Sequence, residues 1–78
     1  MYVLKVAVPD HRDKIYVPTR LVVTDAAQVQ LYTEALNYVG YVFDLTEQND
    51  MPERPQEEVE RARLLAYALL MPAHGTLQ

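Results

Sequence analysis

Residues 21–45 decide the fold of this chain, and they read LVVTDAAQVQLYTEALNYVGYVFDL. The apolar run over 21–23 predicts a strand. A helix is predicted from Thr24 to Val39, because Thr24 or Asp25 can cap its start and Gly40 suits its end. Inward-facing and outward-facing residues alternate over 41–45, which predicts another strand. The stretch therefore forms a strand–helix–strand unit.

The helix of this unit carries one apolar stripe. Its apolar side chains recur at steps of three and four residues, namely Val29, Tyr32, Leu36 and Val39, with Ala35 beside them. This spacing places them on one face, which should pack on a sheet. Leu31 and Tyr38 fall off the centre of the stripe and are expected to be partly exposed.

The residues before this unit predict a β-hairpin around the polar turn 10–14. Pro18 interrupts the returning strand and indicates a bulge or an edge position, so 15–23 forms one bent edge strand or two short strands. A slip in alternation between Val17 and Leu21 should be absorbed around Pro18. The side chains expected to face inward are Tyr2, Leu4, Val6, Val8, Ile15, Val17, Leu21 and Val23, joined by Tyr41, Phe43 and Leu45 from the strand over 41–45.

The residues after the unit predict a long loop and a second helix. Residues 46–55 are polar and contain two prolines. Pro55 suits the first turn of a helix, and Pro72 should end it. The buried stripe of this helix is expected to contain Val59, Ala62, Leu65, Ala66, Leu69 and Leu70.

Together these elements predict an α+β fold of the type ββαβα, a two-layer sandwich. The first strand should lie in the middle of a three-stranded sheet with the order second, first, third, and both helices should cover one face. Residues 1–72 form a single small domain in this prediction, and 73–78 form a flexible tail. The other sheet face, composed of Val3, Lys5, Ala7, Tyr16, Val22 and Val42, is apolar for a surface that no element covers. It indicates either a partly exposed β face or an interface, formed by a second copy or by a partner strand at a sheet edge.

Composition and charge narrow the classes of function. The chain has 78 residues, no cysteine and a net charge of −4. Disulfides and zinc–thiolate sites are excluded, and the net charge disfavours direct binding to nucleic acid. No signal peptide or membrane span is recognised, so a cytoplasmic location is expected. Acidic residues gather in 44–60, where Arg54 is the one basic residue. Such a block is either a solvated surface or one that steers a basic partner.

No arrangement of residues predicts catalysis, a metal site or a cofactor site. His11 and His74 lack the spacing of metal ligands. The run 10–13 places two carboxylates beside an imidazole, but turns favour aspartate for backbone hydrogen bonding, and no nucleophile completes a site. With Gly40 and Gly75 as its glycines, the chain has no phosphate-binding loop. We therefore predict that the protein is not an enzyme.

In length, acidity and lack of cysteine, the chain resembles the small inhibitors and accessory proteins of phages and mobile elements, of which anti-CRISPR proteins are one group. The resemblance rests on type and not on shared residues, and no motif assigns a family. It implies an inhibitor that blocks a basic nucleic-acid-binding site on a partner protein.

We predict a non-enzymatic protein-binding module. The residues predicted to contact the partner are Asp44, Glu47, Asp50, Glu53, Glu57, Glu58, Glu60, Tyr16 and Tyr38. Two alternatives remain open. One is a nucleic-acid-binding domain that uses the open sheet face with Lys5, Arg12, Lys14 and Arg20, and the other is a homodimeric accessory subunit.

Overall fold

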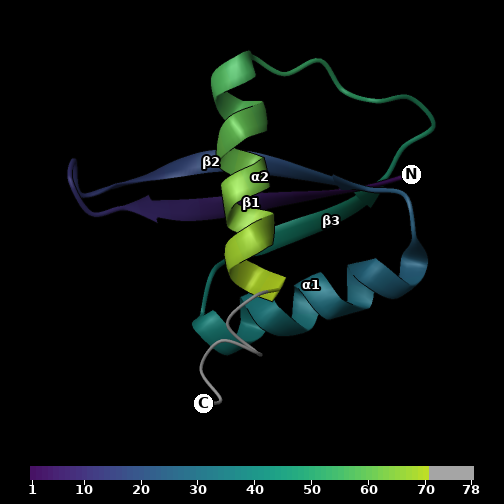
Figure 1. Cartoon of the computed structure of the whole chain (residues 1–78), viewed down its shortest axis with the longest axis horizontal. Coiled ribbons are helices and arrows are strands. Elements are labelled where there is room, and N and C mark those ends of the chain that lie inside the picture. The colour runs from purple at the N-terminus through teal and green to yellow at the C-terminus, as the bar shows by residue number, and fades with distance from the viewer. Residues whose placement is uncertain (71–78) are drawn as a thin grey trace.

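Three antiparallel strands form a sheet, and both helices pack on one face of it (Figure 1). The computed structural model describes residues 1–70. Its elements, in chain order, are β1 (Tyr2–Asp10), β2 (Ile15–Val23), α1 (Ala26–Val39), β3 (Phe43–Glu47) and α2 (Gln56–Leu70). The sheet order is β2-β1-β3, so β1 lies in the middle and is antiparallel to both neighbours. The predicted ββαβα fold and strand order are confirmed.

The β1–β2 register is continuous from Tyr2↔Val23 to Asp10↔Ile15. The predicted slip around Pro18 is therefore wrong. Val17 and Leu21 are four residues apart and already share a face, and Thr19, which lies between them, is fully buried. Pro18 occupies an edge strand, which is the second of the two predicted possibilities for a proline in a sheet.

The core lies between the inner sheet face and the two helices. Its most completely buried side chains are Leu4, Val6 and Leu36. The remaining buried members are Leu21, Val23, Val29, Tyr32, Ala62, Leu65 and Leu69. The predicted stripes of both helices thus meet the alternating residues of β1 and β2, as the two periodicities require.

Three side chains predicted to face the core are instead exposed. Ile15 lies near the hairpin turn at the end of β2, Val39 is the last residue of α1, and Leu45 lies on β3. All three lie at the ends or the margin of the sheet and helix layers. There a side chain can fit the periodicity of a buried face although no other element covers it. Leu31 and Tyr38 are exposed as predicted.

The helix α1 is capped at both ends, and β3 begins two residues later than predicted. Asp25, not Thr24, is the N-cap, and its Oδ1 accepts a hydrogen bond from Ala27 N at 2.9 Å. At the other end, the backbone N–H groups of Gly40 and Tyr41 both donate to Leu36 O. The Tyr41 N–H completes this cap, and the strand starts at Phe43, although Tyr41 still packs on the core.

Within residues 1–70, no helix has the length and apolar character needed to cross a bilayer. Pro72, the predicted stop of the second helix, and the predicted tail over 73–78 lie outside the described residues.

Gly40 provides a test of the helix cap. Its φ of 82° is in the left-handed region, and an added Cβ would meet no atom within 4 Å. Gly40→Ala should therefore lower the free energy of unfolding by about 1 kcal/mol through the backbone alone. Gly40→Asn should cost clearly less, because asparagine tolerates this conformation. Urea denaturation of both variants measures the difference, and equal stability of the two variants would contradict the interpretation.

Candidate functional site

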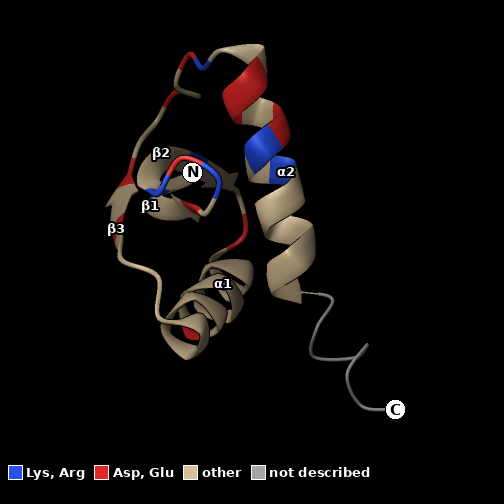
Figure 2. Ribbon diagram, turned by 90° about the vertical axis from the view of Figure 1, so that its left-hand side faces the viewer, with Lys and Arg blue, Asp and Glu red and all other residues tan. Residues whose placement is uncertain are grey.

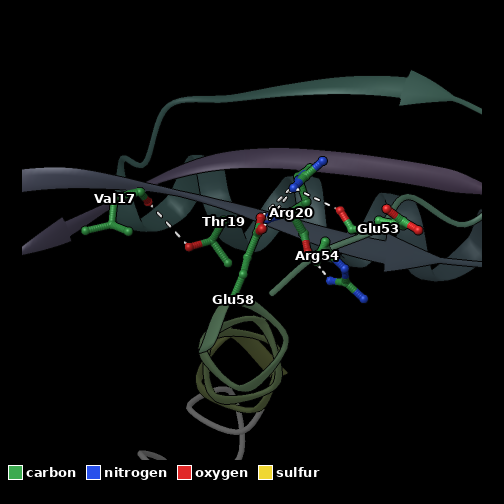
Figure 3. A network of polar contacts seen from close by, with 6 residues as sticks. All are labelled: Val17, Thr19, Arg20, Glu53, Arg54 and Glu58. Carbon is green, nitrogen blue, oxygen red and sulfur yellow. Dashed lines mark hydrogen bonds and ion pairs between the residues drawn. The ribbon is translucent and has the colours of Figure 1, made fainter. Parts of the chain in front are cut away.

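A network of polar side chains joins the start of α2 to the outer edge of β2 (Figure 3). Glu58 Oε2 accepts hydrogen bonds from Arg20 N at 2.9 Å and from Arg20 Nε at 3.0 Å. Glu58 Oε1 accepts from Arg20 Nη2, also at 3.0 Å. The carboxylate therefore binds the guanidinium in a bidentate manner and satisfies a backbone N–H on the strand edge as well.

Arg54 completes this network from the loop before α2. Its Nη1 donates to Arg20 O at 2.6 Å, and Arg20 Nη2 donates to Glu53 O at 3.4 Å. Both outward backbone groups of Arg20 are thus occupied by side chains. The loop and the helix start are attached to the same point on β2.

The ion pair changes the titration of its members. Hydrogen bonds from the Arg20 side chain hold the pKa of Glu58 below its ordinary value, and burial of the carboxylate opposes this shift. The hydrogen bond to Glu58 also raises the pKa of Arg20. The pair is the single salt bridge found among residues 1–70.

Glu58, which we predicted to contact a partner, has a structural role here. It is 7% exposed and fully engaged by Arg20, so it is not available to a partner. The sequence contained a signal for this. Glu58 lies one turn before Ala62 and continues the buried positions Ala62, Leu65 and Leu69 toward the N-terminus of the helix.

The other six predicted acidic residues remain at the surface, and we call them the acidic rim: Asp44, Glu47, Asp50, Glu53, Glu57 and Glu60. Figure 2 shows acidic positions on β3, on the connecting loop and on the first turns of α2. All six are exposed, and within residues 1–70 none of them forms an ion pair. Asp44 lies opposite Lys5 on the outer sheet face, whereas Glu47 points to the inner face.

The two predicted tyrosines lie on elements that carry no residue of the acidic rim. Tyr16 pairs with Pro9 near the hairpin turn, whereas Glu47 pairs with Tyr2 at the opposite end of β1. Tyr38 is on α1 and is 91% exposed. The nine predicted residues therefore divide into the acidic rim, one internal carboxylate and two separate tyrosines.

The outer sheet face is open, as its alternation predicted, but its apolar residues are not uniformly exposed. Val3 is 3% exposed, and it lies between Val22 and Thr46 on the neighbouring strands. Tyr16 and Val42 are the exposed apolar side chains of this face. Because Glu58 engages the guanidinium of Arg20, the basic side chains left for a nucleic-acid surface are Lys5, Arg12 and Lys14.

The hairpin turn has the structural role expected of its aspartates. Asp10 Oδ1 accepts hydrogen bonds from the backbone N–H groups of Arg12 and Asp13. Lys14 adopts a left-handed conformation with φ of 59° and completes the turn. Among residues 1–70, no group of three or more acidic or histidine side chains is arranged to hold a metal ion.

Comparison with known proteins does not assign the chain to a class: no family model, curated protein or solved structure matches it.

The pH dependence of stability tests the role of Glu58. Because its pKa is lowered by folding, its contribution is fully present above the pKa of the unfolded chain and is lost as the pH falls through the folded value. Glu58→Gln should therefore lower the free energy of unfolding by about 1–2 kcal/mol near neutral pH. The difference in the free energy of unfolding between this variant and the parent protein should become smaller below about pH 4.5.

Chemical denaturation between about pH 7 and about pH 3 measures this gap. Glu57→Gln is the matched control, since Glu57 is exposed on the same helix turn and should leave the gap near zero throughout. A Glu58→Gln gap that is independent of pH would show that the ion pair does not contribute as described.

Proposed function

We propose that this protein is a non-enzymatic binding module whose acidic rim contacts a basic surface of a partner protein. The observation that carries this proposal is the sorting of charge in residues 44–60. Arg54, the one basic residue of this segment, turns inward to Arg20 O, while the six carboxylates of the acidic rim face solvent without an ion pair in the described chain. The exposed charged side chains of the segment are therefore all acidic.

Such a surface favours a partner of complementary charge. Unpaired exposed carboxylates accelerate encounter with a positive surface and suppress binding to other acidic molecules. The attachment of Arg54 and Glu58 to β2 holds the end of the loop and the start of α2 in place. A rim that is ordered before binding loses less conformational entropy when the complex forms.

The partner we propose is a protein with a basic nucleic-acid-binding site, which the acidic rim would cover. This choice follows the resemblance in size and charge to the inhibitors of phages and mobile elements, including anti-CRISPR proteins. The mechanism is competition: the carboxylates occupy positions that the phosphates of a nucleic acid would otherwise occupy. No covalent step is involved.

Charge reversal in the acidic rim tests the proposal. The tagged protein would first be used to isolate its partner from the native host at low ionic strength, and the purified pair would then be titrated. Glu57→Lys/Glu60→Lys should weaken binding by about tenfold or more at about 50 mM salt and should flatten its salt dependence. Addition of a nucleic acid that the partner binds should displace the parent protein.

The control variant is Asp13→Lys/Glu34→Lys, which changes the net charge equally at exposed positions on the hairpin turn and α1. It should retain at least half of the parent affinity. Equal weakening by the two double variants would indicate a nonspecific effect of net charge and would contradict the proposal. Failure of Glu57→Lys/Glu60→Lys to weaken binding would also contradict it.

A further inference from the structure

The two edges of the sheet differ in what occupies them. On β2, side chains of Glu58 and Arg54 bind the outward N–H and C=O of Arg20. Pro18, two residues before, lacks an N–H and offers no donor on that edge. A further strand could not pair along β2 without displacing this network. The β2 edge is therefore protected in the manner of native edge strands.

The β3 edge has no such protection among residues 1–70. Its pairing with β1 uses even-numbered residues: Val42 O accepts from Ala7 N at 2.9 Å, and Gln48 N donates to Met1 O at 2.8 Å. Since backbone groups of alternate residues point to opposite sides of a strand, those of Phe43, Leu45 and Glu47 point away from β1. No hydrogen bond within the described chain uses them. Figure 2 shows β3 on the side of the sheet away from α2.

The side chains along this edge combine apolar surface with negative charge. Leu45 is 46% exposed on the inner face, where neither helix covers it. Asp44 is exposed on the outer face, and Glu47 is exposed at the end of the strand. Asp44 and Glu47 belong to the acidic rim, so the open edge and the charged surface are continuous.

We propose that the β3 edge accepts an extended basic segment of the partner as a fourth strand of the sheet. Main-chain hydrogen bonds to Phe43, Leu45 and Glu47 would supply affinity, and alternate side chains would supply selectivity. The proposal rests on the proposed function, because charge complementarity with the acidic rim selects a basic occupant. A second copy of the chain is disfavoured as the occupant, since its own β3 would bring further carboxylates to the same edge.

The register defines the preferred sequence of an antiparallel occupant. The residue opposite Leu45 should be apolar, and the residues opposite Asp44 and Glu47 should be basic. Read from its N-terminus, the segment should therefore follow the pattern basic–any–apolar–basic. A suitable probe is the acetylated, amidated peptide Thr-Lys-Thr-Val-Lys-Val-Thr, whose first valine lies opposite Leu45.

N-methylated forms of the peptide test the main-chain pairing. The N–H of the first valine would face β3, whereas the N–H of the following lysine would face solvent. In fluorescence anisotropy at about 50 mM salt, N-methylation of that valine should weaken binding by about tenfold or more. N-methylation of that lysine should change the affinity by less than about twofold, because it removes no bond in this register. Equal effects of the two modifications, or no binding of the parent peptide, would overturn the proposal.

A variant of the protein provides an independent test. Leu45→Pro removes an outward N–H without removing a β1–β3 bond, and Leu45→Thr removes the apolar side chain but keeps the N–H. Thermal melting is used to confirm that the variants fold. Leu45→Pro should weaken the binding of both the peptide and the isolated partner by about tenfold, a much larger loss than Leu45→Thr should cause. If Leu45→Pro does not fold, the N-methylated peptides decide the question alone.

The two proposals fail in different ways. If the partner binds Leu45→Pro as tightly as the parent protein but binds Glu57→Lys/Glu60→Lys more weakly, the strand proposal is wrong and the proposed function of the acidic rim stands. If the partner binds the Glu57→Lys/Glu60→Lys variant normally, the proposed function is wrong. Sedimentation that shows a dimer of the parent protein and a monomer of Leu45→Pro would identify a second copy as the occupant and would overturn the strand proposal.

Discussion

The contact between Arg20 and Glu58 is the interaction on which the rest of this structure depends. It joins positions 38 residues apart in the chain and contributes three hydrogen bonds to one carboxylate. A buried carboxylate without such partners would be strongly unfavourable, because burial removes its hydration. Here the guanidinium and a backbone N–H replace that hydration. The first turn of α2 can therefore pack closely against β2, although glutamate is rarely buried.

This contact also sorts the charges of the molecule. Arg20 and Arg54 turn toward the strand edge and Glu58, and the remaining carboxylates of 44–60 are left at the surface. The same arrangement closes the β2 edge. One set of contacts thus accounts for two features of the surface, its negative rim and the obstruction of the β2 edge at Arg20.

Much of the fold could be predicted because local sequence and tertiary packing require the same residues. A cap at Thr24 or Asp25, the Gly40 stop and the stripe Val29, Tyr32 and Leu36 follow from helix geometry alone, and the structure shows Asp25 as the cap. The strand order followed from topology, since the β2–α1–β3 crossover leaves room for β1 between the two outer strands. Ile15 and Leu45 lie on the inner face as predicted, but they and Val39 are exposed, because periodicity indicates which way a side chain faces but not whether another element covers it.

The candidate site was less predictable than the fold. Acidity over 44–60 is visible in the sequence, but composition alone does not distinguish Glu58 from its neighbours. The position of Glu58 on the same helix face as Ala62, Leu65 and Leu69 indicates burial. Its partner could be identified only from the packing of α2 on β2.

By itself, the sequence determined the elements of this protein, their order in the sheet and the sign of its surface charge, because these depend on local periodicity, capping and composition. The tertiary structure decided which carboxylate is internal, which sheet edge is closed and which remains open. The physical reason is that the pairing of Arg20, Arg54 and Glu58 depends on distances between segments far apart in the chain, and those distances exist only once the helices have packed on the sheet.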